Sequence, residues 1–337
     1  MSPRIPLSVL DVIPLRDGST ARVAMEETVA LARAVDALGY RRLWFAEHHG
    51  MGGIASSSPA VMIARVASET SRIRVGSGGV MLPNHSSLAI AEQFGTLEAL
   101  FPGRIDLGLG RAPGTDGMTA RVLRRGARPE TDADFPQQLD ELFGFFRRDF
   151  EVDHPYRRIQ ATPAFGNEPP VWLLGSSDFS ARLAGDLSLP FAFAHHFSQE
   201  NTLPALAAYR AHFRPSEKRP SPEVMLASMV VVADTDAEAQ RLALPNALVF
   251  LRIRRGELGP YPTLEQAEAY PWTPEERRFA EHWLSSNIVG SPTTVRTRLK
   301  QLLDATQPSE LMALCAVPDI EARIHSYTLL RELHDAA

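Results

Sequence analysis

Two adjacent pairs of histidines lie at the ends of short apolar runs, His48 with His49 and His195 with His196. Side chains of consecutive residues on a strand point to opposite sides, so one histidine of each pair faces each way. We expect His48, which shares its side of the strand with Trp44, to reach a site beyond the strand end. A neutral imidazole near its ordinary pKa suits proton transfer at neutral pH. The alternative is a histidine with a purely structural role.

A second candidate site is the run Gly175, Ser176 and Ser177, between an apolar run and a helical segment. Backbone N–H groups and serine hydroxyls at a helix start bind anions such as phosphate, and the helix dipole favours negative charge there. Plain capping of the helix by either serine is the alternative. Arg111 directly follows another apolar run and could add a cation for the same anion, or form a surface ion pair.

Glycines interrupt two apolar runs, at residues 75–82 and 105–109. Glycine inside a strand loses more backbone freedom than other residues and supplies no side chain to pack. A flat ligand lying close to the backbone would explain Gly78 and Gly79, and close packing inside a tight barrel would explain them equally well. The dinucleotide fingerprint G-x-G-x-x-G fails because Pro113 occupies the place of its third glycine.

The two histidine pairs could also suggest a metal site. Adjacent histidines on a strand diverge, however, and no H-x-H spacing or carboxylate cluster completes a ligand set. We therefore predict no metal ligands, and keep a metal-dependent site as a minor alternative.

The elements that must position these residues are short apolar runs alternating with helical segments. We expect strands at about residues 5–13, 43–46, 75–82, 105–109, 170–174, 191–194, 224–233 and 311–317. Helices are expected at about 21–38, 59–70, 89–100, 133–150, 179–185, 202–213, 237–244, 292–306 and 319–333. Residues 111–128 are predicted to form an exposed loop, and residues 252–281 the least regular region.

The strand candidates show little alternation of apolar and polar residues, which is typical of strands buried on both faces. About eight of them over 337 residues predict an α/β fold, a (β/α)₈ TIM barrel with a late insertion or lid loop. Active sites in such barrels lie at the carboxyl ends of the strands. The candidate residues above all fall at those ends.

Composition narrows the function classes further. The net charge of −5 gives no general attraction to nucleic acid or anionic membranes, and no apolar run approaches the length of a membrane helix. The N-terminus lacks a signal-peptide pattern. The single cysteine, Cys315, lies in an apolar run expected to be a buried strand. We expect one cytoplasmic domain over residues 1–337, with no nucleic-acid or membrane partner.

Five segments together resemble the bacterial luciferase-like family of flavin-dependent monooxygenases, over almost the full chain. Their order and spacing carry the resemblance; they are Ala46-Glu47-His48-His49 and residues 76–83, 103–111, 174–177 and 289–292. The resemblance implies a TIM-like barrel that binds FMN at its carboxyl rim. It also implies a non-proline cis peptide after the third strand, here Gly78–Gly79, against which the flavin ring lies.

The resemblance also assigns site residues. His48 corresponds to the family's catalytic histidine. The residues implied to bind FMN are Ser77, Gly78, Gly79, Arg111, Gly175, Ser176 and Ser177. The reactive cysteine of the luciferases proper falls at Gly110, which argues against long-chain aldehyde luminescence and leaves general monooxygenation intact. Residues 252–281 fall where the family carries a mobile lid, which we expect to close over reduced flavin and exclude water.

The implied reaction is oxygenation of a small organic substrate by O₂ and reduced FMN, through a 4a-hydroperoxyflavin. A separate flavin reductase would supply the reduced FMN, and a homodimer would form through the first barrel helices. A role in secondary metabolism fits the arginine-rich composition. The alternatives are an F420-dependent oxidoreductase on the same barrel, a metal-dependent barrel hydrolase and a non-catalytic flavin-binding relative.

Overall fold

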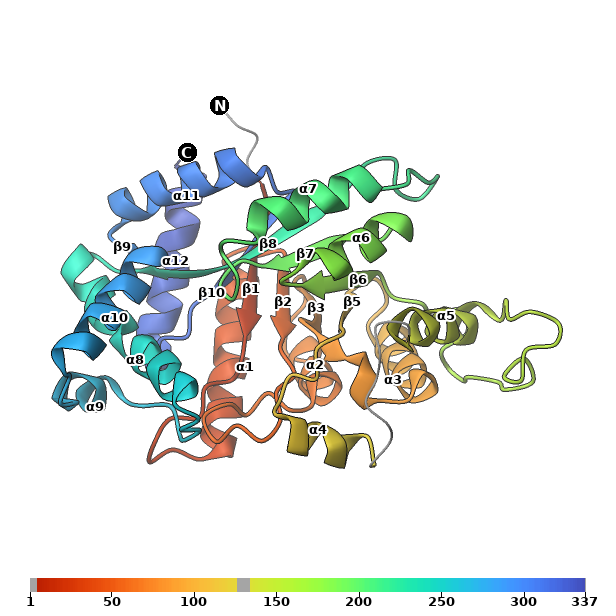
Figure 1. Cartoon of the computed structure of the whole chain (residues 1–337), viewed down its shortest axis with the longest axis horizontal. Helices are drawn as coiled ribbons and strands as arrows, with labels where there is room; N and C mark the ends of the chain where they lie inside the picture. Colours follow the sequence, from red (N-terminus) through yellow and green to blue (C-terminus); the bar gives the residue numbers. More distant parts are fainter. Residues whose placement is uncertain (1–4, 126–133, 337) are drawn as a thin grey trace.

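The fold of the computed structural model, which describes residues 5–125 and 134–336, is a closed parallel barrel (Figure 1). Within these residues eight parallel strands form the ring, and β10 pairs with both β1 and β8 to close it. The strands are β1 (Leu7–Asp11), β2 (Arg42–Phe45), β3 (Arg74–Ser77), β5 (Ile105–Gly110), β6 (Val171–Gly175), β7 (Phe191–Ala194), β8 (Val224–Val232) and β10 (Glu310–Leu314). The predicted (β/α)₈ barrel is confirmed.

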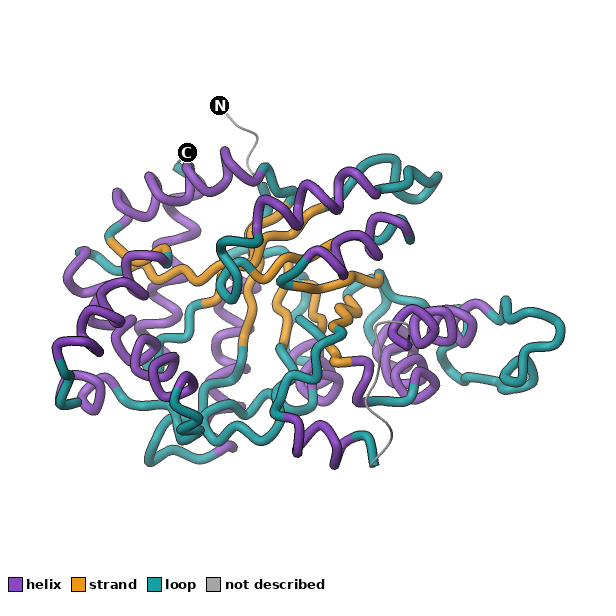
Figure 2. The backbone as a smooth tube through the Cα atoms, in the orientation of Figure 1, coloured by secondary structure: helices purple, strands orange, loops and turns teal. Residues whose placement is uncertain are grey.

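Helices surround the strands, as Figure 2 shows. They are α1 (Ala21–Ala37), α2 (Pro59–Ala67), α3 (Ser87–Leu100), α5 (Asp134–Arg147), α6 (Asp178–Asp186), α7 (Thr202–His212), α8 (Asp236–Arg254), α11 (Pro292–Thr306) and α12 (Ile320–Asp335). Helix α1, for example, buries Leu31 and Val35 on its apolar stripe. No helix in the described parts of the chain has the length and apolar character needed to cross a membrane.

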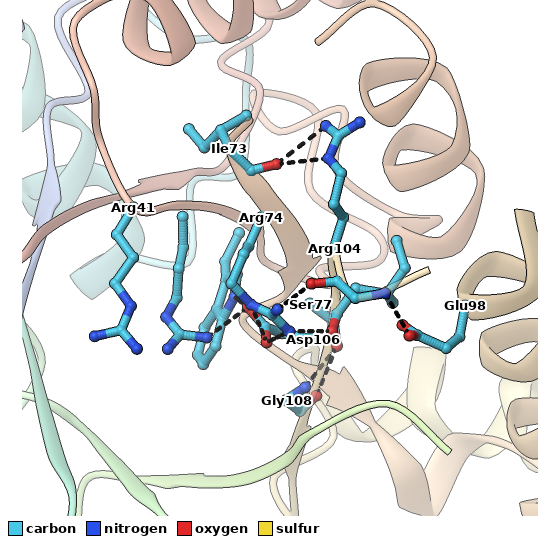
Figure 3. A network of polar contacts seen from close by, with 12 residues as sticks. Arg41, Ile73, Arg74, Ser77, Glu98, Arg104, Asp106 and Gly108 are labelled. Carbon is cyan, nitrogen blue, oxygen red and sulfur yellow. Dashed lines mark hydrogen bonds and ion pairs between the residues drawn. The ribbon is translucent and has the colours of Figure 1, made fainter. Parts of the chain in front are cut away.

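The third strand is interrupted where one continuous run over residues 75–82 was expected. β3 ends at Ser77, the Gly78–Gly79 peptide is cis as predicted, and the chain continues as β4 (Val80–Met81) and a 3₁₀ turn. The Ser77 hydroxyl donates to the Gly108 carbonyl at 2.9 Å and accepts from the Gly108 N–H at 3.0 Å (Figure 3). The serine therefore joins β3 to β5 at the interruption, in place of regular strand pairing.

The close approach of β3 and β5 requires glycine at position 108. A Cβ added there would lie 2.1 Å from the Ser77 carbonyl oxygen, which is backbone and cannot swing away. We expect Gly108→Ala to lower the free energy of unfolding by about 1–3 kcal/mol through overpacking. Urea unfolding measures the change. The matched control is Gly117→Ala, where an added Cβ meets nothing within 4 Å and unfolding should change little; equal losses in both variants would contradict the explanation.

Residues 111–128 are not simply an exposed loop, because they contain the helix α4 (Gly117–Leu123). The Asp116 side chain caps it by accepting hydrogen bonds from the N–H groups of Met118 and Thr119. The loop prediction is therefore wrong over this helix, and residues 126–128 lie outside the described part.

Residues 252–281 are mostly helical, so the expected irregularity is wrong. Helix α8 runs to Arg254, and α9 (Leu264–Ala269) and α10 (Pro274–Ser286) follow before β9 (Ile288–Gly290), on the left in Figure 1. A capping box starts each new helix, from Thr263 and Thr273. Pro274 occupies the first turn of α10, where proline is favoured, so a residue interpreted as a breaker is a start signal. Movement of this segment as a lid stays a prediction.

Charged residues occupy the barrel interior at the amino ends of the strands. Arg42 is bonded to Asp106 at 2.8 Å and to Glu310 at 2.9 Å, and all three side chains are almost fully buried. Arg74 donates to the other oxygen of Asp106 at 2.6 Å (Figure 3). This group, the buried charge network, closes the end of the barrel opposite to the predicted site.

Candidate active site

A cavity of about 250 Å³ opens at the carboxyl ends of the strands. Its floor is mainly apolar and includes Leu10, Trp44 and Met312. The structure brings together here seven of the eight residues assigned from sequence, namely His48, Gly78, Gly79, Arg111, Gly175, Ser176 and Ser177. Residues from β2, β3, β5 and β6 thus converge on one space, as expected for a barrel rim.

Ser77 is the exception among the assigned residues. Its side chain is fully buried and hydrogen-bonded to Gly108, so it lies beneath the cavity and does not line it. Gly78 and Gly79 do line the cavity, and they are also tightly packed. A Cβ on Gly79 would lie 2.8 Å from the Gly108 carbonyl oxygen, and one on Gly78 would lie 2.9 Å from Leu10. The two explanations weighed for these glycines, close packing and bare backbone facing a ligand, are therefore compatible.

The polar end of the cavity lies at the start of α6. Ser177 occupies the N-cap position, yet its side chain makes no capping hydrogen bond, so simple capping does not account for it. The Arg111 guanidinium stacks over the ring of Phe179 in the first turn of α6, with its Cζ 4.2 Å from the ring centroid. A helix N-terminus, two serine hydroxyls and a guanidinium on one wall form a cradle suited to an oxyanion such as phosphate.

His48 faces the cavity and is held by the backbone. Its Nδ1 lies 3.1 Å from the Gly114 carbonyl oxygen, so Nδ1 carries the proton and Nε2 is left as an acceptor. Burial lowers the pKa of His48 below its ordinary value, against the opposing effects of the Gly114 carbonyl and Glu47. The imidazole is therefore neutral at neutral pH. Gly114 itself has a positive φ of 65°, which favours glycine.

His49 turns away from the cavity, so the first histidine pair diverges as predicted. Its Nε2 lies 2.9 Å from Glu47, and the Nε2 of His85 lies 2.8 Å from the same carboxylate oxygen. Burial alone would raise the pKa of Glu47, but the hydrogen bonds from His85 and His49 outweigh it and hold the pKa below its ordinary value. Sequence reasoning missed His85, because only the fold brings it to Glu47.

The second histidine pair also diverges. His196 lines the cavity, whereas His195 is bonded through Nδ1 to the Thr202 hydroxyl at 2.7 Å. Among the described residues, no group of three or more His, Cys, Asp or Glu side chains is arranged to hold a metal ion. The sequence placed His195 and His196 together at a strand end and assigned neither a role; the structure shows that His196 is the one that lines the cavity.

Sequence comparison identifies relatives over nearly the whole chain. The model of the luciferase-like monooxygenase family matches residues 6–307. The protein YvbT of Bacillus subtilis is 46% identical over 97% of this chain and 96% of its own. A luciferase-like monooxygenase of Escherichia coli is 42% identical over 98% and 97%. The N-acetyl-S-alkylcysteine monooxygenase of B. subtilis is 33% identical over 97% and 98%.

Solved structures share the fold. The crystal structure of apo-MsnO8 superposes with a TM-score of 0.88 at 37% identity, covering 99% of both chains. The oxygenating constituent of 3,6-diketocamphane monooxygenase from Pseudomonas putida, a structure with FMN, has a TM-score of 0.71 at 20% identity, covering 98% and 97%. An F420-dependent secondary alcohol dehydrogenase reaches 0.68 at 13%, covering 96% and 97%. The last two likenesses concern the fold alone.

The barrel, the cavity at its carboxyl rim and the family match agree with one another. The match covers most of the chain, and relatives well above 30% identity extend over almost all of it. This chain belongs to the luciferase-like monooxygenase family.

Proposed function

We propose that this protein is a monooxygenase that uses reduced FMN and O₂ to oxygenate a small organic substrate. The observation that carries the proposal is the pairing, in one cavity, of an anion cradle at Arg111 and Ser177 with the cavity-lining backbone of Gly78 and Gly79. The names of two relatives, a luciferase-like monooxygenase and the N-acetyl-S-alkylcysteine monooxygenase, support an oxygenase.

The residues of the cavity fit a flavin mononucleotide. Arg111, Ser176, Ser177 and the first N–H groups of α6 would hold the phosphate, and Gly175 lets α6 begin close to β6, since a Cβ there would lie 2.8 Å from the Cβ of Ser180. The backbone of Gly78 and Gly79 would support the ring. Bound reduced flavin supplies the two electrons that activate O₂, while the protein orients the reactants and keeps water out.

His48 would hold or move a proton beside the ring. Its Nε2 is unprotonated, because Nδ1 donates to Gly114, and it faces the cavity where a substrate would enter. Segment 252–281 would close the mouth and exclude water, which favours oxygen transfer over release of peroxide.

The proposal includes two protein partners. A separate reductase would supply reduced FMN, as the name of the 3,6-diketocamphane enzyme's oxygenating constituent suggests for that protein. A second copy of this chain would dimerise through the first barrel helices, where Val61 on α2 and Leu100 on α3 are 67% and 62% exposed. A cytoplasmic location belongs to the same proposal.

Titration of the purified chain with FMN, reduced FMN and F420, followed by absorbance, tests the cofactor. We expect reduced FMN to bind and F420 to bind far more weakly. The reverse order would instead favour the F420-dependent alternative, whose fold this barrel shares. Peroxide release is then measured across aldehydes, ketones, thioethers and aromatic compounds, and a true substrate should lower the peroxide formed for each reduced flavin consumed.

Arg111→Ala should weaken binding of reduced FMN by roughly 10- to 100-fold, because a charged hydrogen-bond donor to the phosphate is lost. Riboflavin has no phosphate and is the matched ligand control: its affinity should be nearly the same in both proteins. Arg111→Lys should recover part of the loss, since it restores the charge but not the two-pronged geometry. Equal weakening of FMN and riboflavin would show that Arg111 does not bind the phosphate.

A further inference from the structure

A second imidazole, that of His196, faces the cavity in a fixed tautomer. Its Nδ1 lies 3.0 Å from the Ala227 carbonyl oxygen, and a carbonyl can only accept. Nδ1 therefore carries the proton, and Nε2 presents a lone pair. No hydrogen bond to Nε2 occurs among the described residues. The backbone N–H of His196 donates to the same carbonyl, so this contact fixes both the turn after β7 and the ring.

The environment of His196 keeps the ring neutral. Burial, aided by the nearby His195 and His48, lowers its pKa to about 4 against the opposing effect of the Ala227 carbonyl. The ring packs against Phe197 at the mouth, with the two centroids 4.4 Å apart. His48 shows the same pattern, with Nδ1 on the Gly114 carbonyl and Nε2 left as an acceptor. The two neutral imidazoles, which follow β2 and β7, thus each present a lone pair to the same cavity.

The cavity is chemically asymmetric as a result. Arg111 is the one charged side chain among the described residues that line it, and it lies at the α6 end with the serines. The histidine side has acceptors and no donor side chain, so an anion there would meet lone pairs and apolar walls. An O–H or N–H group would instead find two acceptors that face the cavity, and each could receive a hydrogen bond from it.

We propose that His196 and His48 form a two-acceptor site that selects an uncharged substrate carrying an O–H or N–H donor. This assignment rests on the proposed function, because the donor belongs to the molecule that is oxygenated beside the flavin. His196 acts here as a specificity residue: its Nε2 accepts a hydrogen bond from the O–H or N–H group and so orients the substrate. The Nε2 of His48 remains free to accept a proton from the reacting group.

The test compares two probes that differ in one donor, 4-ethylphenol and 4-ethylanisole, by calorimetry at pH 7. A phenol, with a pKa near 10, is neutral at this pH. We expect wild-type protein to bind the phenol roughly three- to tenfold more tightly, the difference made by one neutral hydrogen bond. The preference should vanish in His196→Phe. The Ala227 carbonyl keeps its backbone donor in this variant, so no buried acceptor is left unpaired.

His195→Gln is the matched control, from the same turn but outside the cavity, and should retain the preference for the phenol. Nitrogen-15 NMR of labelled histidines gives a second readout that does not depend on a variant folding: phenol should shift the His196 Nε2 signal, and anisole should not. No preference in wild type, or a preference that survives in His196→Phe, would overturn the proposal. So would an unshifted Nε2 signal at high phenol concentration.

FMN titration separates this inference from the function on which it rests. We expect His196→Phe to bind FMN as wild type does. A large loss of FMN affinity in this variant would mean that the imidazole faces the flavin, and would overturn the substrate assignment. Failure of wild-type protein to bind FMN or reduced FMN would remove the proposed function, and the phenol and anisole comparison could still be read separately.

Discussion

Asp106→Ala is expected to lower the free energy of unfolding by about 3–5 kcal/mol, because it removes one partner from a buried charge network. The carboxylate is fully buried and accepts from Arg42 at 2.8 Å, from Arg74 at 2.6 Å and from the Trp44 indole at 3.1 Å. Without it the Arg42 guanidinium keeps Glu310 as its ion-pair partner and the ring of Trp172 beside it, and the Trp44 N–H loses the hydrogen bond to Asp106. Urea or thermal unfolding of the purified variant measures the loss.

An exposed ion pair supplies the control for this prediction. Lys300 and Asp304 pair within α11 with side chains 71% and 50% exposed, so Asp304→Ala should cost at most about 0.5 kcal/mol. Asp106→Asn keeps the size and one acceptor oxygen and should fall between the two. If Asp106→Ala unfolds no more easily than Asp304→Ala, the network does not stabilise the barrel. Trp44 also lines the cavity, so Asp106 holds a side chain of the site as well as the closed end of the barrel.

The fold could be predicted because its signals are local and repeated. Short apolar runs without alternation, each followed by a helical stripe, occur along the whole chain, and the strands found differ from those expected mainly at their ends. The cis peptide at Gly78–Gly79 came from the family resemblance, but the break in the strand after Ser77 was not predicted, since glycine content alone could not distinguish a continuous strand from an interrupted one. Residues 252–281 were misjudged because prolines were counted as breakers, although Thr273 followed by Pro274 and Glu276 is a helix-start pattern.

The candidate site was predictable where a polar or charged side chain comes just after the end of a strand, as at His48, Arg111 and Ser176. What escaped prediction are contacts between segments far apart in the chain. Nothing near His85 in the sequence indicates that it donates to Glu47, and nothing near His196 indicates that Ala227 fixes its tautomer. Ser77 shows the opposite error: a strand-end position is not enough, because its hydroxyl is used between strands.

His48→Gln is expected to lower the rate of substrate oxygenation by roughly 100- to 1,000-fold, within the range for loss of a positioned acid–base group. Glutamine can still donate to the Gly114 carbonyl, so the local fold is retained while the basic Nε2 is lost. Because burial depresses the pKa of His48, the neutral imidazole persists below pH 6.5, its ordinary value. Oxygenation by wild-type protein should therefore stay constant through neutral pH and fall only at lower pH, and His48→Gln should lack this acid-side fall.

The measurement is the oxygenation rate and the peroxide released for each reduced FMN consumed, from pH 5 to 8, with a substrate found in the peroxide-release panel. His49→Gln is the matched control, because its ring is bonded to Glu47 outside the cavity. It should keep the rate at neutral pH and the acid-side fall, displaced slightly to higher pH because His49 lowers the pKa of His48. Binding of reduced FMN should be similar in all three proteins, which separates a lost proton-transfer group from a lost flavin site. A His48→Gln enzyme that oxygenates at the wild-type rate would assign the proton transfer to another group, and an acid-side fall that survives the substitution would do the same.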